Sequence, residues 1–150
     1  MTELAEVARL LSLDHGLCVV STLRADGSIQ KHPIVGRKCG RARTSVSGAP
    51  VVGFVARGAA RKLANLRRRR RATVTARAGW EWAAVEGAVE LIGPEDRLDT
   101  VDADGVRLLL RDIFTAAGGT HDDWDTYDAV MAAERRTAAL VSPERVYSNG

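Results

Sequence analysis

The 150-residue sequence has few of the residues that mark several common protein classes. Its two cysteines, Cys18 and Cys39, form no CxxC pair, and with only three histidines a zinc site is not expected. No apolar run approaches the ~20 residues of a membrane helix. The N-terminus, with Glu3 and Glu6, is not a secretory signal. We therefore expect one cytoplasmic domain over residues 1–150, without disulfides, structural metal or a membrane partner.

Acidic residues are absent from one long stretch of the chain. Between Gly27 and Trp80 there is no Asp or Glu, whereas fourteen Lys and Arg residues fall there; the remainder has eight basic and nineteen acidic residues. A continuous basic segment creates a localised positive field, which predicts an anionic partner. That partner is either a phosphate-bearing cofactor or a nucleic acid. Neither a P-loop nor a GxGxxG fingerprint is present, so the common nucleotide-binding folds do not apply.

The hydrophobic pattern predicts a mainly β protein with a few helices. Helices are expected over residues 3–12, 59–68, 106–117 and 124–135, and strands over 17–23, 29–35, 51–56, 72–77, 81–92 and 137–142. The strand over 81–92 is expected to be interrupted near Gly87, and Val146–Tyr147 to extend the last strand. Residues 36–49 show no clear pattern. Six short strands with hairpins predict a small mixed barrel.

Residues 55–66 carry the clearest chemical signal. A strand ends, a turn at Gly58 follows, and a helix begins with Arg61 and Lys62 in its first turn. Cations there oppose the helix dipole at a cost of ~0.3–1 kcal/mol each. Free amides at a helix start, together with nearby cations, form a phosphate site, and bound phosphate reverses that cost. Asn65 lies one turn later on the same side and can hydrogen-bond a ligand. The alternative is a solvated basic helix start.

Four stretches, in order and spacing, identify a family that the chain resembles. They are VVSTLRADGSIQKHPIV, FVARGAARKLANLRR, ATVTARAGWEWAAVEGAVELIGPED and ALVSPERVYSNG. Over nearly its whole length the chain resembles the pyridoxamine 5'-phosphate oxidase-like split-barrel superfamily, and in it the actinobacterial branch of deazaflavin (coenzyme F-420)-dependent reductases. The resemblance implies a mainly β (α+β) fold, a six-stranded split β-barrel with short flanking helices. It also implies a homodimer with cofactor in an interface groove.

The resemblance assigns roles to individual residues. Arg57, Arg61 and Lys62 would hold the cofactor phosphate, and Ser21, Thr22, Pro33, Ile34 and Val35 would line the ring. Trp80 and Trp82, on one face if they share a strand, would approach the cofactor or its acidic tail, from the partner subunit; alternatively both pack on the barrel. Tyr147 is a candidate proton donor. Residues 36–45 depart from the family, whose members carry a small uncharged stretch there; one hypothesis is a compensated frameshift, which the coding DNA would test.

The implied function is hydride transfer from reduced coenzyme F-420 to a conjugated small-molecule acceptor. Enones, quinones and polycyclic secondary metabolites belong to this class, and antibiotic-biosynthesis tailoring is one such setting. The alternatives are an FMN-dependent oxidase or flavin reductase of the same fold, and a non-catalytic coenzyme-binding protein. A nucleic-acid role for Arg67–Arg71 is not favoured, because no aromatic residues are interleaved for base stacking. Holding an anionic cofactor tail suits that run better.

Overall fold

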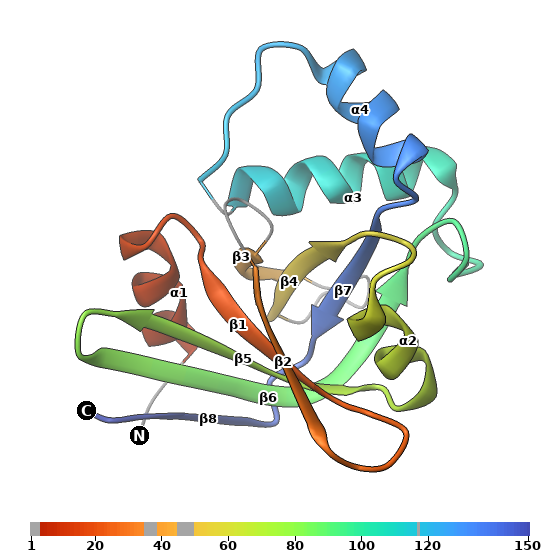
Figure 1. Cartoon of the computed structure of the whole chain (residues 1–150). Helices are drawn as coiled ribbons and strands as arrows, with labels where there is room; N and C mark the ends of the chain where they lie inside the picture. Colours follow the sequence, from red (N-terminus) through yellow and green to blue (C-terminus); the bar gives the residue numbers. More distant parts are fainter. Residues whose placement is uncertain (1–3, 35–38, 45–49, 117) are drawn as a thin grey trace.

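A computed structural model describes residues 4–34, 39–44, 50–116 and 118–150; of residue 34 and residues 39–44 it describes the backbone. Its elements follow the chain in the order shown in Figure 1. The helices are α1 (Leu4–Leu13), α2 (Arg61–Arg68), α3 (Ala103–Ala116) and α4 (Trp124–Ala133). The strands are β1 (Cys18–Leu23), β2 (Ile29–Ile34), β3 (Cys39–Thr44), β4 (Pro50–Ala56), β5 (Arg71–Ala78), β6 (Glu81–Ile92), β7 (Thr137–Val141) and β8 (Arg145–Ser148).

The strands form one antiparallel sheet in the order β2-β1-β5-β6-β7-β4-β3, with β8 paired to β6. The described residues thus contain eight strands rather than the six expected from the pattern. One addition is β3, which lies in the stretch without a clear pattern and pairs with β4. The other is β8: Val146 and Tyr147 do not extend the last strand but pair with Val85 and Ala84 of β6. The expected class, a mainly β barrel with short helices, is confirmed.

The long strand β6 runs through Gly87 without a break, contrary to the expected interruption. Gly87 marks a change of partner, because β6 pairs with β8 before it and with β7 after it. The Ser142 amide donates to the Ala88 carbonyl at 2.9 Å, so the chain between β7 and β8 crosses β6 here. A Cβ at position 87 would lie 1.8 Å from the Ser142 carbonyl oxygen. Glycine is therefore required by a close backbone crossing.

Two apolar clusters hold the barrel and its helices together. In one cluster, Val7 and Leu10 of α1 and Leu63 of α2 pack with inward-facing strand residues, which include Val20, Val74, Val85 and Phe54. Outside the barrel, Leu110 and Ile113 of α3 pack on β4, β7 and the end of β6 at Val51, Val55, Ile92 and Leu140. Figure 1 shows α3 and α4 on one side of the molecule and β8 on the other. In the described part of the chain, no helix has the length and apolar character to cross a membrane.

Candidate functional site

Several predicted site residues lie on one face of the sheet formed by β2, β1, β5, β6 and β8. Directly opposed residues of antiparallel strands share a face. The register gives one row of Lys31, Ser21, Thr73, Glu86 and Arg145, and a second row of Pro33, Val19, Thr75, Ala84 and Tyr147. Trp82, opposite Arg77, continues this face beyond the second row. We call these residues the outer face; Ser21 and Pro33 lie toward its β2 edge, and Trp82 and Tyr147 lie toward its β8 edge.

A groove of about 320 Å³ runs beside the first row of the outer face. Its lining includes Ser21 of β1, Glu86 and Gly87 of β6, and the cations Arg69 and Arg71. Arg71 is paired with Glu144 at 2.6 Å, whereas Arg69 has no ion pair within the described residues. From the sequence we interpreted the arginine run as a helix end or as a site for a cofactor tail, and we did not predict that Arg69 and Arg71 line a groove. The strand that follows the run could have indicated it. Strand β5 begins at Arg71 and pairs with β1, so the end of the run lies beside β1.

Asn65 and Thr22 have positions different from those expected of ligand-contacting side chains. Both side chains are buried, and the Asn65 Nδ2 donates to Thr22 Oγ1 at 3.1 Å and to Gln30 Oε1 at 2.8 Å. Both N–H groups of the amide are therefore used within the protein. The reason is that the side of α2 on which Asn65 lies packs against the β1–β2 hairpin. The side chain expected to contact a ligand therefore contacts the barrel. Asn65 instead fixes α2 beside the groove.

The start of α2 has the features of an anion site. Ala60 is the N-cap, no side chain caps the helix, and its first turn has no acidic residue. Arg61 is exposed there and has no ion pair in the part of the chain that the structure describes. At Gly58 a Cβ would lie 2.8 Å from the Arg135 Cβ, so the turn into α2 fits tightly against the end of α4. Uncapped amides beside cations fit a phosphate group.

Arg57 and Lys62 lie at the same turn. The Arg57 side chain is mostly exposed, and its Nη2 is 3.4 Å from a Glu134 carboxylate oxygen. Lys62 is partly buried in the first turn of α2. The structure therefore brings together the three cations that the resemblance assigned to the cofactor phosphate.

The two tryptophans do not share a strand. Trp80 lies in the β5–β6 turn after Gly79, whose φ is +62°, and its side chain is 89% exposed. It therefore does not pack on the barrel. Trp82 is in β6 and meets the Tyr147 ring edge-on at 6.0 Å. Asn149 holds this turn, since it accepts from the Trp82 amide at 3.0 Å and donates to the Trp80 carbonyl at 2.9 Å.

Tyr147 has a carboxylate partner that the sequence did not indicate. Its hydroxyl donates to Glu86 Oε2 at 3.2 Å. Desolvation, followed by this hydrogen bond, raises the pKa of Tyr147 above its usual value. Glu86 is also 3.4 Å from Arg145, so the carboxylate is held from two sides.

Figure 1 shows α2 at one end of the molecule and the turn between β5 and β6, which holds Trp80, at the other. Strand β5 separates them, and its eight residues span about 25 Å at ~3.3 Å per residue. A single chain therefore does not bring Trp80 to Arg61 or Lys62. Among the remaining predicted ring contacts, the backbone of Ile34 pairs with Cys18, and Val35 lies outside the described residues. No group of metal-binding side chains is found in the described part of the chain.

Comparison with known proteins identifies the fold. No family model matches the sequence. A pyridoxamine 5'-phosphate oxidase-related, FMN binding protein from Nostoc punctiforme gives a TM-score of 0.63 at 12% identity, over 96% of this chain and 81% of that one. This chain has the split-barrel fold of the pyridoxamine 5'-phosphate oxidase-like proteins. An F-420 reductase gives 0.57 at 14% identity, over 87% of this chain and 88% of that one.

A further split barrel is a Clostridium acetobutylicum protein of the pyridoxinephosphate oxidase family, related to general stress protein 26. It gives a TM-score of 0.60 at 12% identity, over 97% of this chain and 86% of that one. At such identities the likeness is one of fold. The split-barrel neighbours therefore support the arrangement of strands, and the assignment of site residues stands on the geometry above.

Proposed function

We propose that this chain is a homodimeric oxidoreductase that uses coenzyme F-420 to reduce a conjugated acceptor such as an enone, a quinone or a polycyclic secondary metabolite. The observation that carries the proposal is the start of α2, where no side chain caps the helix, the first turn holds Arg61 and Lys62 but no acidic residue, and Arg57 lies just before it. The coenzyme carries a phosphate, which suits that site. The F-420 reductase among the structural neighbours supports the choice of coenzyme.

The chain's own residues would orient the coenzyme and exclude water. Arg57, Arg61 and Lys62 would hold its phosphate, and Ser21 with Pro33 on the outer face would lie along the ring. When bound, the reduced deazaflavin supplies a hydride for an electron-poor carbon of the acceptor. The Tyr147 hydroxyl would supply the proton that completes the reduction, with Glu86 holding the phenol in place. Positioning and electrostatics are then the protein's contribution.

Homodimer formation is part of the proposal. Within one chain the tryptophans lie far from the cations of α2, and the Trp80 side chain is almost fully exposed. A second copy would bring its Trp80 toward the coenzyme and cover the ring from the open side. Tryptophan is among the residues enriched at protein interfaces.

A fluorescence titration of the purified apo-protein with coenzyme F-420 and, separately, with FMN tests the choice of cofactor. We expect saturable binding of F-420 at lower concentration than FMN, followed by oxidation of the reduced coenzyme when a quinone or enone is added. Tighter binding of FMN would favour the FMN-dependent alternative, which the FMN-binding structural neighbour represents. Tight F-420 binding without turnover on any acceptor would indicate a coenzyme carrier.

A further inference from the structure

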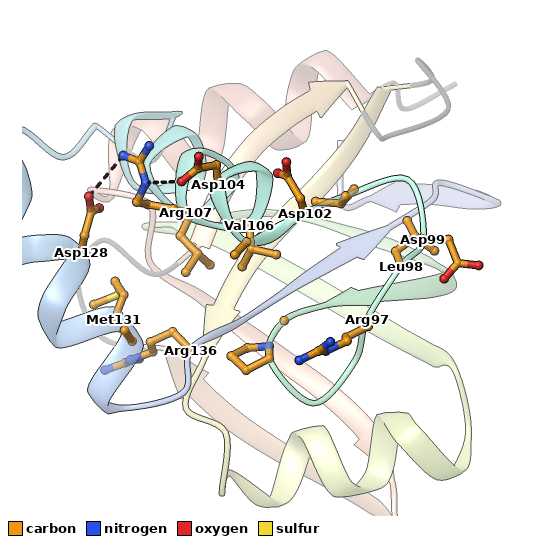
Figure 2. A pocket seen from close by; sticks show the side chains of 16 residues that line it. Arg97, Leu98, Asp99, Asp102, Asp104, Val106, Arg107, Asp128, Met131 and Arg136 are labelled. Carbon is orange, nitrogen blue, oxygen red and sulfur yellow. Dashed lines mark hydrogen bonds and ion pairs between the residues drawn. The ribbon is translucent and has the colours of Figure 1, made fainter.

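A second cavity lies away from the outer face. It has a volume of about 660 Å³ and is bounded by α3, α4 and the segment 93–104 (Figure 2). This volume falls within the ~300–1,000 Å³ typical of small-molecule sites. The middle of the lining is apolar and comes from Leu98, Val101, Val106, Leu110 and Met131. The cavity can therefore cover a compact apolar body.

One buried cation lines this cavity with donors to spare. Arg136 is only 5% exposed, and its Nε donates to Glu134 Oε2 at 2.5 Å, while its Nη2 is paired with the same oxygen. Within the described residues its Nη1 has no acceptor. A guanidinium has five N–H donors, and a buried donor without an acceptor is costly. A hydrogen-bond acceptor on a bound molecule would satisfy it.

Charges of opposite sign are separated across the cavity. Figure 2 shows Arg136 and Arg97 along its lower edge, and Asp102, Asp104 and Arg107 along its upper edge. Arg97 adds a second positive charge on the edge where Arg136 lies, and no ion pair involves it in the described part of the chain. A negatively charged group is therefore favoured at the lower edge.

The acidic upper edge limits how much negative charge a ligand can carry. Asp128, which also lines the cavity, is held by Arg111 and Arg107, and Asp104 is 3.5 Å from Arg107. Asp102 Oδ1 accepts from the Gly105 amide at 2.7 Å. A multiply charged anion would meet these carboxylates, whereas an apolar body with one charged end would not.

From these features we propose that the cavity binds a small molecule with an apolar body and a single carboxylate, which Arg136 receives with support from Arg97. The cavity lies over the outside of β7 beside α3 and α4 and shares no lining residue with the groove of the outer face, although Glu134, which pairs with both Arg136 and Arg57, connects it to the start of α2. The proposal does not depend on the coenzyme, and its test uses the full chain without it.

The test is a fluorescence titration with two probes that share one ring skeleton. One is 8-anilinonaphthalene-1-sulfonate, a monoanion, and the other is N-phenyl-1-naphthylamine, which lacks the charged group. We expect one saturable sulfonate site per chain. Val106→Trp fills the cavity and should weaken both probes at least tenfold. Arg136→Met keeps apolar volume without charge, and should weaken the sulfonate about tenfold while leaving the neutral probe within twofold.

Two further variants keep the result decisive. If Arg136→Met does not fold, as judged by circular dichroism, Arg97→Met replaces it and should weaken the sulfonate about threefold and the neutral probe not at all. Ser21→Trp alters the groove of the outer face and should leave both probes unaffected. Loss of binding in Ser21→Trp but not in Val106→Trp would overturn the proposal. Equal weakening of both probes by the arginine variants would overturn it as well.

Discussion

Two cations in the first turn of α2 stand where a helix ordinarily favours acidic residues. Arg61 and Lys62 lie at the positive end of the helix dipole, in a first turn that contains no acidic residue and has no side-chain cap. The arrangement weakens the isolated helix slightly. It becomes favourable when an anion binds between the amides and the two side chains.

Replacing Lys62 tests this residue-scale argument. Lys62→Ala should weaken coenzyme F-420 binding by about 1–3 kcal/mol, the scale of a lost charge-assisted hydrogen bond. A fluorescence or calorimetric titration measures the dissociation constant. The matched control is Arg107→Ala, which removes a cation of α3 away from the start of α2 and should change the constant little. Equal effects of the two changes would mean that general positive charge, not the helix start, binds the coenzyme.

Gly87 is the position where the backbone leaves no room for a side chain. Gly87→Ala should destabilise the protein by about 3 kcal/mol or more, because its Cβ would overlap the Ser142 carbonyl oxygen and the two strands would have to separate. Urea unfolding measures the loss. Gly27→Ala is the comparison: it has open space but a φ of +85°, so it should cost only about 1–2 kcal/mol of backbone strain. A smaller loss at Gly87 than at Gly27 would contradict the crossing described here.

At the scale of the element, periodic and well-bounded segments could be predicted from the sequence. The helix expected over 59–68 is α2 at Arg61–Arg68, and the strand expected over 72–77 is β5 at Arg71–Ala78. The Asp-Gly turn joins β1 to β2 as expected, with Ser28 bonded to the Asp26 carboxylate at 2.9 Å. Alternation and turn residues act locally, so they are visible without the rest of the chain.

Elements and contacts set by distant pairing could not be predicted in the same way. The residues of β3, CGRART, show no apolar alternation, and their strand conformation comes from pairing with β4. The prediction that Trp80 and Trp82 share a strand face was wrong, because the turn at Gly79 leaves Trp80 outside the strand. The burial of Asn65 depends on the β1–β2 hairpin, whose approach to α2 no local pattern indicates.

The C-terminal end of α2 is anchored by Arg67, which pairs with Asp96 and, at 3.6 Å, with Glu95. Arg67 Nη2 lies 2.7 Å from Asp96 Oδ2, and the Asp96 side chain is only 6% exposed. Arg67→Ala should cost about 2–3 kcal/mol in urea unfolding, because it leaves a nearly buried carboxylate without its partner. Arg70→Ala, on an exposed side chain, should change stability by less than about 0.5 kcal/mol. Similar losses for both would show that the pair does not hold the helix end.

Helices α3 and α4 are joined by a carboxylate between arginines, which makes their packing sensitive to acid. The hydrogen bond from Arg111, reinforced by its charge and by Arg107, lowers the pKa of Asp128 below its usual value. The stabilisation is therefore present above the unfolded-state value of ~3.9 and is lost as pH falls through the lower folded-state value. Asp128→Asn should cost about 1 kcal/mol at pH 7.

Urea unfolding at pH 7 and at pH 3 measures this dependence. The difference in the free energy of unfolding between the wild type and Asp128→Asn should shrink at pH 3. At that pH the aspartate of the unfolded chain is largely protonated. Asp122→Asn, an exposed residue before α4, provides the control and should show no such change. A difference that is the same at both values would contradict the ion pair's role.

For the molecule as a whole, the proposed homodimer makes a prediction about its mass in solution. We expect light scattering to give about twice the chain mass of 16.2 kDa. Trp80→Asp should shift the protein toward a single chain. The change removes the 89% exposed ring that the second copy would cover and puts a charged side chain in its place. Leu108→Asp changes an exposed apolar residue of α3 and should leave the mass unchanged. A fully active single chain would contradict the shared site.

The strand β6 belongs to both halves of the barrel, since its first half pairs with β5 and β8 and its second half with β7. We expect that neither half separates while the other keeps its hydrogen bonds, because the same continuous strand forms part of both halves. Heating should therefore separate the whole structure in one cooperative step. The groove beside Gly87 would then stay intact up to the temperature at which the protein itself melts.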